Sequence, residues 1–118
     1  MKCDVAVIGA GAAGIASAIA AAESGASVVL VERYGFVGGL ATSAMVGTIC
    51  GLFYRNPSDP HYAVRGFARE FAEHLQKGSC TSPVMFSEGL HFLPYQPSVF
   101  HQQAILQLQQ LGVSVMLH

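Results

Sequence analysis

Three glycines and one acidic residue near the start of the chain have the spacing of a nucleotide-binding loop. Gly9, Gly11 and Gly14 form a GxGxxG pattern directly after the apolar run "CDVAVI", and Glu32 lies 18 residues beyond Gly14. In such a loop the first glycine permits a tight turn, the second lets the backbone approach a pyrophosphate, and the third allows close helix packing. A helix N-terminus attracts phosphate oxygens, and a carboxylate at Glu32 can accept hydrogen bonds from a ribose. These residues together predict a dinucleotide site.

A strand, a helix and a second strand are predicted around this loop. The apolar run Cys3–Ile8 suits a buried parallel strand, and the alanine-rich stretch Gly11–Ser24 suits a helix ended by Gly25. The β-branched run Ser27–Glu32 predicts the next strand. Residues 3–32 therefore form one βαβ unit, whose right-handed crossover lays the helix on one face of a parallel sheet.

The acid at the end of the second strand restricts which nucleotide fits. The carboxylate of Glu32 repels a 2′-phosphate, which argues against NADP in this pocket. The neighbouring Arg33 has two alternative roles: its guanidinium lies along an adenosine, or it is a solvated surface charge.

A glycine pair follows Glu32 and indicates which class of dinucleotide-binding protein the sequence resembles. The stretch "DVAVIGAGAAGIASAIAAAESGASVVLVERYGFVGG" ends in Gly38-Gly39, six residues past Glu32. This stretch resembles the N-terminal FAD-binding segment of the flavoproteins with two dinucleotide-binding domains. The resemblance is strong from Asp4 to Thr42 and persists in weaker form to the end of the chain. It implies FAD as the cofactor, whereas NAD-binding dehydrogenases do not usually carry the glycine pair.

The resemblance also implies which residues contact the cofactor. Gly9, Gly11 and Gly14 would face the pyrophosphate. The alanines between them, Ala10, Ala12 and Ala13, are also expected to bind the cofactor. Glu32, with Arg33 beside it, would lie at the ribose. Those along the phosphate and ribityl chain would be Gly38, Gly39, Leu40, Ala41 and Thr42. The glycine pair has its own physical reason, because backbone must pass close to the cofactor there and open another helix N-terminus onto it.

The rest of the chain is predicted to complete an α/β, Rossmann-like FAD/NAD(P)-binding fold, a parallel sheet with flanking helices. Expected elements in residues 1–118 are a helix over 38–46, an extended segment over 46–53, helices over 60–77 and 98–111, and a strand over 113–117. Asp59 and Pro60 have the types of an N-cap and first helical residue. The stretch "MFSEGLHFLPYQP" is either irregular or a short hairpin.

Composition excludes several classes of function. The chain is 52% hydrophobic and only 11% charged, against roughly 25% charged in typical soluble domains. A net charge of −1 with no basic run gives no argument for nucleic acid. Glycine breaks in the apolar N-terminal stretch argue against a membrane span or signal peptide. Three widely spaced cysteines suit reduced thiols in the cytoplasm.

The remaining residues that could take part in chemistry are expected to have structural or solvent-exposed positions. Cys50 is expected to be a buried apolar cysteine in a strand, with a redox thiol near the flavin as the alternative. The five histidines show no metal-ligand spacing, so no metal is expected: they are His61, His74, His91, His101 and His118. Tyr54-Arg55 and Arg65–Arg69 are expected to be solvated, with a carboxylate-binding role as the alternative. No catalytic residue is predicted, because in flavoenzymes the cofactor carries the hard chemistry.

The sequence therefore predicts the N-terminal part of an FAD-dependent oxidoreductase acting on an unidentified small molecule. The family's late Gly-Asp segment and substrate domain have no counterpart in these 118 residues. We therefore expect an incomplete domain that associates with itself or with a completing subunit. Two alternatives remain: a non-catalytic remnant or nucleotide-binding subunit, and the nucleotide domain of an NAD-dependent dehydrogenase.

Overall fold

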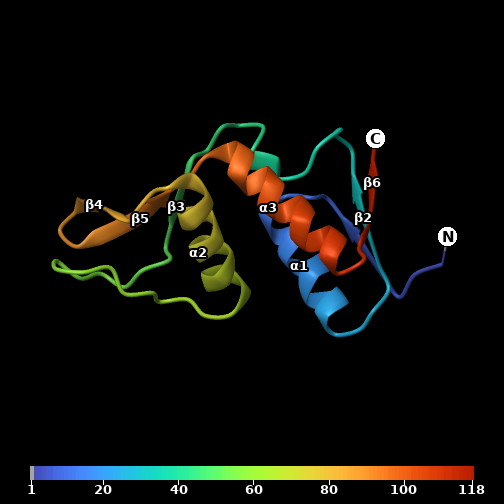
Figure 1. Ribbon diagram of the computed structural model, residues 1–118, viewed down its shortest axis with the longest axis horizontal. Helices are drawn as coiled ribbons and strands as arrows, with labels where there is room; N and C mark the ends of the chain where they lie inside the picture. Colours follow the sequence, from blue (N-terminus) through green and yellow to red (C-terminus); the bar gives the residue numbers. More distant parts are fainter. Residues whose placement is uncertain (1) are drawn as a thin grey trace. The chain divides into compact units, whose positions relative to one another are not determined.

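A computed structural model describes residues 2–118 and divides them into two compact units (Figure 1). The first unit comprises the chain up to Val46 together with Phe100–His118, and the second is Gly47–Val99. The elements in chain order are β1 (Val5–Ile8), α1 (Ala12–Glu23), β2 (Val28–Glu32), the 3₁₀ turn η1 (Gly39–Ala41), β3 (Thr48–Cys50), α2 (Phe67–Ser79), β4 (Val84–Ser87), β5 (Leu90–Pro94), α3 (Pro97–Gln110) and β6 (Ser114–Leu117).

The first unit is built on a parallel sheet in the order β1-β2-β6. Val5 pairs with Val28 in the first ladder, and Val29 pairs with Ser114 in the second. Helix α1 connects β1 to β2, so the predicted strand–helix–strand order at the start of the chain is present. The α/β class with a parallel sheet is confirmed.

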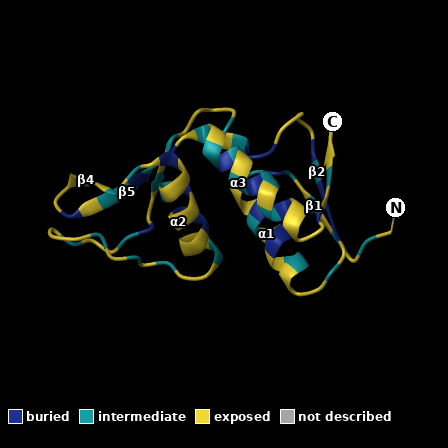
Figure 2. Ribbon diagram, in the orientation of Figure 1, coloured by how far each residue is buried: buried dark blue, intermediate teal, exposed yellow. Residues whose placement is uncertain are grey.

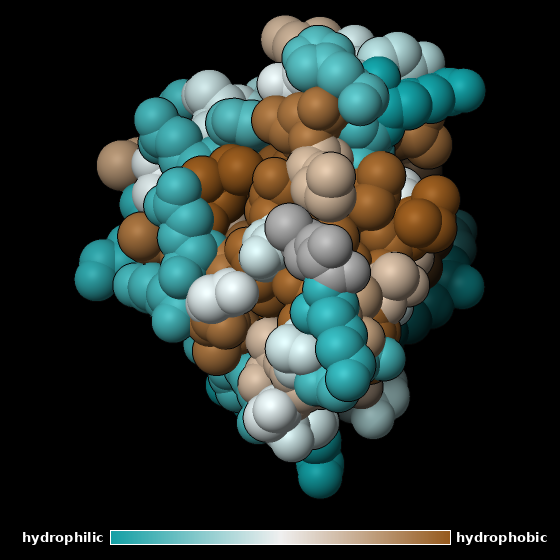
Figure 3. All heavy atoms as spheres, turned by 90° about the vertical axis from the view of Figure 1, so that its right-hand side faces the viewer, coloured by the Kyte–Doolittle hydropathy of each residue, from teal (hydrophilic) through white to brown (hydrophobic). Residues whose placement is uncertain are grey.

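One face of this sheet packs on α1, and the other is largely open. Successive strand residues point to opposite faces, so Val7 faces α1 while Ile8 points away from it. Leu30, the partner of Val7, is completely buried, and Ile15 of α1 is almost completely buried. Figure 2 shows buried positions along both α1 and β2. Ile8 is 79% exposed and Met116 is 49% exposed. Figure 3 shows hydrophobic residues gathered on this side of the unit.

The helices that lead into β2 and β6 end in the same way. At the end of α1 the N–H of Gly25 donates to the Ala22 carbonyl, and the N–H of Ala26 donates to the Ala21 carbonyl. This is the Schellman pattern, and Gly25 has the positive φ of +87° that it requires. The same pair of bonds closes α3 before β6. Among residues 2–118, no helix has the length and hydropathy needed to cross a bilayer.

The second unit is an antiparallel sheet in the order β3-β5-β4 with α2 on one side. Its core contains Leu52, Ala72 and Leu93. The stretch left open by the sequence is a hairpin, because β4 and β5 pair with a bulge near Met85. The two ends of the unit are also joined, since the Tyr95 N–H donates to the Gly47 carbonyl at 2.8 Å.

The predicted helix over 60–77 is wrong at its start. The structure begins α2 at Phe67, after Gly66. Asp59 and Pro60 do not start a helix, because the chain that follows them pairs as extended backbone with the segment after β3. Tyr62 forms a β-bridge with Phe53, and the Ala63 N–H donates to the Leu52 carbonyl. Backbone pairing with the segment after β3 therefore overrides the local preference of Asp59 and Pro60 for a helix start.

The predicted helix over 38–46 is reduced to the single 3₁₀ turn Gly39–Ala41. Gly38 has a φ of +118°, outside the helical region, and Met45 has a φ of +54°. The Thr42 hydroxyl donates to the carbonyls of Val37 and Gly39. Such side-chain bonds to nearby backbone compete with helix propagation.

Gly14→Ala tests how tightly the βαβ unit is packed. A Cβ at Gly14 would lie 1.8 Å from the Gly9 carbonyl oxygen, which is backbone and cannot rotate away. We expect the variant to lose about 3 kcal/mol or more of unfolding free energy, measured by urea denaturation. Gly11→Ala is the matched control, because a Cβ there meets nothing within 4 Å. Equal stability of the two variants would contradict this packing.

Candidate functional site

A cavity of about 410 Å³ lies in the first unit at the carboxyl ends of its parallel strands. This is where open α/β sheets bind ligands. The last residues of β1 and β2 reach it, together with the residue that follows β6. Its lining is Ile8, Gly9, Val31, Glu32, Arg33, Tyr34, Gly39 and His118.

The glycines of the loop after β1 have two different functions in the structure. A Cβ at Gly9 or Gly11 would meet nothing within 4 Å, so both backbones border open space. Gly14 instead packs against the Gly9 carbonyl, where a side chain cannot fit. The first two glycines therefore leave room for a ligand, and the third holds the helix against the strand.

The N-terminus of α1 has the electrostatic character of an anion site. Gly11 is its N-cap and makes no side-chain capping bond, and the first turn, which contains Ala12 and Ala13, has no acidic residue. Partial positive charge on the first N–H groups is therefore not offset by a carboxylate of the helix itself.

The glycine pair lies directly beside the first loop. The Gly38 N–H donates to the Ala10 carbonyl at 2.7 Å, and Gly38 forms a parallel bridge with Gly11. A Cβ at Gly39 would lie 3.0 Å from the Gly11 Cα, which explains why only glycine fits there without displacement. Two motifs separated by more than twenty residues in the sequence thus form one continuous backbone surface.

The three residues after the pair differ in how they are placed. Leu40 is 75% exposed, whereas Ala41 and Thr42 are half-buried. The Thr42 hydroxyl donates to neighbouring carbonyls. The predicted contacts of these three residues with the phosphate and ribityl chain stay predictions.

Glu32 connects the two turns that border the cavity. One carboxylate oxygen, Oε2, accepts from the Ala10 N–H at 2.7 Å, and Oε1 accepts from the Tyr34 N–H at 3.0 Å. The side chain is 7% exposed. The bond from Ala10, followed by that from Tyr34, holds the pKa of Glu32 below its usual value. The group is therefore a carboxylate at neutral pH, and its oxygens can accept further hydrogen bonds from a ligand.

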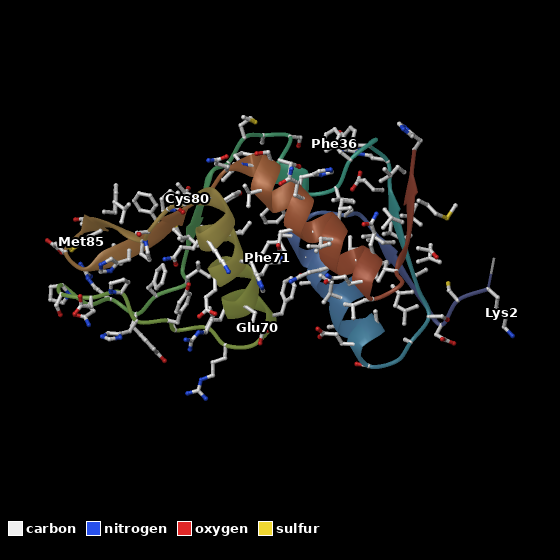
Figure 4. All side chains as sticks on the ribbon, viewed as in Figure 1. Lys2, Phe36, Glu70, Phe71, Cys80 and Met85 are labelled. Carbon is white, nitrogen blue, oxygen red and sulfur yellow. The ribbon has the colours of Figure 1, made fainter. Side chains whose placement is uncertain are left out.

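Aromatic residues extend the cavity wall beyond Glu32. The guanidinium of Arg33 lies 4.7 Å from the centre of the Tyr34 ring and donates to the Tyr34 hydroxyl at 2.9 Å. The Tyr34 ring stacks on that of Phe36, which Figure 4 labels, with 5.9 Å between centroids. These three side chains are exposed, so they form a platform of stacked groups open to solvent.

Sequence reasoning missed several of the lining residues. Tyr34 was not singled out, and His118 was treated with the other histidines. The backbone N–H of His118 donates to the Glu32 carbonyl at 2.9 Å, and the residue lines the cavity. The rule that ligands bind beyond the carboxyl ends of parallel strands could have found both, since each residue closely follows a strand.

The other candidate residues do not line this cavity. Cys50 is exposed, so the expectation of a buried cysteine is wrong: it lies on a short strand whose outer face is uncovered. Arg55 pairs with Glu88 at 2.7 Å and Arg69 with Glu73 at 2.8 Å, in exposed positions. Within residues 2–118, no group of three or more His, Cys, Asp or Glu side chains could hold a metal ion.

Comparison with known proteins identifies the family. The model of the family described as FAD dependent oxidoreductase matches residues 4–118. The chain belongs to this family. A urocanate reductase of Eggerthella lenta is 61% identical over 36 residues, which are 30% of this chain and 6% of that protein. The resemblance to FAD-binding flavoproteins is thus confirmed, and the shared stretch is a small part of the reductase.

Solved structures of other proteins share the fold. THI4 of Thermovibrio ammonificans superposes with a TM-score of 0.60 at 18% identity, covering 98% of this chain and 38% of that one. A 3-ketosteroid-delta4-(5alpha)-dehydrogenase of Rhodococcus jostii gives 0.60 at 16%, covering 98% and 37%. An L-amino acid deaminase of Proteus vulgaris gives 0.58 at 14%, covering 98% and 44%. The Rossmann-like fold is confirmed, and the chain spans less than half the length of each structure.

Glu32→Gln tests whether the carboxylate holds the two turns together. A glutamine has a single carbonyl oxygen, so it can serve only one of the N–H groups of Ala10 and Tyr34 and leaves the other without its acceptor. We expect a fall in Tm on the order of 5 °C at neutral pH, measured by circular dichroism.

The pH dependence separates this role from simple packing. Because folding lowers the pKa of Glu32 below 4.5, its contribution is complete above that pH and is lost as the pH falls through the folded-state value. The variant should therefore lose less stability than wild type between neutral and acidic pH. Asp4, whose pKa is lowered by hydrogen bonds from Ser27, keeps its own part of the slope. Parallel pH profiles of the two proteins would contradict the proposed contact.

Proposed function

We propose that the first unit binds the ADP portion of FAD within an oxidoreductase that acts on a small molecule. The observation that carries this proposal is the cavity at the strand ends, bordered by open glycine backbone on one side and the Glu32 carboxylate on the other. Membership of the FAD-dependent oxidoreductase family supports the choice of cofactor.

Each wall of the cavity suits one part of the nucleotide. The pyrophosphate would lie over Gly9 and Gly11, whose missing side chains leave the space, and against the N-terminus of α1. The ribose hydroxyls would donate to the carboxylate oxygens of Glu32. The exposed side chains of Arg33 and Tyr34, which stack on each other, would lie beside the adenine. The glycine pair and residues 40–42 would follow the phosphate and ribityl chain.

The reaction would come from the bound cofactor, and the described residues would position it. When bound, FAD supplies an isoalloxazine ring that accepts or returns two electrons. Glu32 holds the loop geometry before the nucleotide arrives, so less ordering remains to be done on binding. Its negative charge also disfavours a 2′-phosphate, which separates this site from an NADP site.

The substrate of this chain is not inferred from that of any similar protein. The similar proteins bear the names of a urocanate reductase, a ketosteroid dehydrogenase and an amino acid deaminase, so their substrates differ. We propose a small-molecule substrate on the basis of the family alone. The three free cysteines support the proposed location in a reducing compartment such as the cytoplasm.

Association of the first unit with itself or a completing partner also forms part of the proposal. Within the described residues, β1 and β6 each pair with β2 alone, so each leaves an unpaired edge. The open face beside these edges exposes Ile8 and Met116. Unpaired edges next to apolar surface favour addition of further strands or chains.

Gly11→Val tests the pyrophosphate position. A Cβ at this position meets nothing within 4 Å, and the valine methyl groups would occupy the open space over the loop, so we expect a folded variant that no longer binds ADP or FAD. Isothermal titration calorimetry measures the binding, and Tm measures the folding. Ala20→Val is the matched control, because it adds valine to an exposed position of α1 away from the loop. Equal ADP affinity in Gly11→Val and wild type would remove the site assignment.

A second variant tests the ribose contact. With Glu32→Gln, we expect ADP affinity to fall about tenfold and the preference for ADP over its 2′-phosphorylated form to narrow, because the repelling charge is gone. Both affinities are measured at pH 7, where the folded fraction is checked first. If the variant discriminates between the two nucleotides as sharply as wild type, Glu32 does not lie at the ribose.

A further inference from the structure

The second unit has a sheet face that no helix covers, and it is apolar. Cys50 pairs with Phe92, and Phe92 pairs with Val84, so these three residues share one face of the sheet β3-β5-β4. The opposite face packs Leu93 into the core with Ala72 of α2. We call the first of these the open face.

Large apolar side chains are exposed along the open face. Phe86 is 75% exposed, Leu90 is 46% exposed and Val84 is 44% exposed. Soluble proteins rarely leave aromatic and aliphatic side chains grouped in this way unless the surface binds something.

A cavity borders the open face. Its volume is about 460 Å³, which is in the range of small-molecule sites. Its lining also includes His91, which alternates with Phe92 along β5, and Phe53, which packs against the core. Three phenylalanine rings contribute to its walls. The lining residues are Thr48, Cys50, Gly51, Phe53, Phe86, Leu90, His91 and Phe92.

The polar groups of this cavity are few and of defined type. No Asp, Glu, Lys or Arg lines it. The Nδ1 of His91 lies 3.1 Å from the Gly89 carbonyl oxygen, which can only accept, so Nδ1 carries the hydrogen. In the neutral ring, Nε2 is then a hydrogen-bond acceptor. The His91 and Phe53 rings meet in a T-shaped arrangement, with 6.3 Å between their centroids.

We propose that this cavity binds an uncharged, ring-bearing small molecule that carries one hydrogen-bond donor. The phenylalanine rings would stack against the ligand ring, and Nε2 of His91 would accept from its hydroxyl or N–H group. A charged ligand is disfavoured because no opposite charge lines the cavity to offset its desolvation. The site lies entirely in the second unit and does not depend on the proposed nucleotide site.

The thiol of Cys50 provides a direct assay, because it lines the cavity and is exposed. The probe is 2-naphthol, which is neutral at pH 7 and has one hydroxyl donor. The full 118-residue chain is alkylated with iodoacetamide, and each cysteine-containing peptide is quantified by mass spectrometry. Cys80, at the C-terminus of α2 and labelled in Figure 4, is exposed but outside the cavity, so it is the control within the same molecule.

The expected result is protection of one thiol. At a probe concentration about ten times Kd, about one site in eleven is free, so alkylation of Cys50 should slow about tenfold while that of Cys80 is unchanged. The anion 2-naphthoate, of similar size, should give no protection. Naphthalene, which lacks the donor, should protect at higher concentration than 2-naphthol.

Two variants locate the contacts. Phe86→Ala should raise the Kd of 2-naphthol about fivefold by removing a stacking ring that is largely exposed and not needed for the core. Met85→Ala is the control. Met85, which is labelled in Figure 4, is next to Phe86 on β4 and is 53% exposed, but it does not line the cavity. This variant should leave the Kd unchanged. His91→Phe should keep the shape and remove the preference for 2-naphthol over naphthalene.

Several outcomes would overturn the proposal. Equal slowing at Cys50 and Cys80 would show a general effect of the probe. Unchanged alkylation of Cys50 at the solubility limit of 2-naphthol would show that the cavity does not bind it. Slow alkylation of Cys50 in the absence of probe would show that protein fills the cavity. If the alkylation slows further as the protein concentration rises, a second copy of the chain fills it; if it does not, the same chain fills it.

Discussion

The hydrogen bonds of the Glu32 carboxylate hold together the site on which the proposed function depends. Its side chain joins the turn after β1 to the turn after β2, and its backbone carbonyl accepts from the residue that follows β6. Three strand ends thus meet at one residue. The Ala10 carbonyl then accepts from Gly38, which brings the glycine pair to the same place. Removal of the carboxylate would weaken the connection between the loop after β1 and the turn that contains Tyr34, while the backbone bonds to Gly38 and His118 would remain.

The parts of the fold that the sequence predicted are those fixed by short-range constraints. Gly14 must be glycine because a neighbouring carbonyl occupies the position of its Cβ, and Gly25 must accept a positive φ at a helix end. Both constraints act within one strand–helix–strand unit, so spacing along the chain reveals them. The distance from Gly14 to the acid is set by one helix and one strand, which is why Glu32 could be placed before its contacts were known.

The parts that could not be predicted depend on segments that are distant in the sequence. Helix α2 begins late because Tyr62 pairs with Phe53, a preference that no local propensity contains. Cys50 is exposed because its strand lies at one edge of a sheet whose outer face is uncovered. An apolar run in the sequence predicts a strand equally well whether or not its face is covered. His118 lines the cavity at the strand ends only because β6 pairs with β2.

The bond between Tyr95 and Gly47 has a consequence for the order of folding. The chain must close a long loop before Ser114 can pair with Val29, and the entropy cost of closure grows with loop length. The second unit lies within that loop, and its folding fastens its two ends together. Since each halving of the loop lowers the closure cost by about 0.6 kcal/mol, early folding of this unit would speed the addition of β6. A segment inserted between two parts of a domain thereby lowers the entropy cost of forming the last strand pairing.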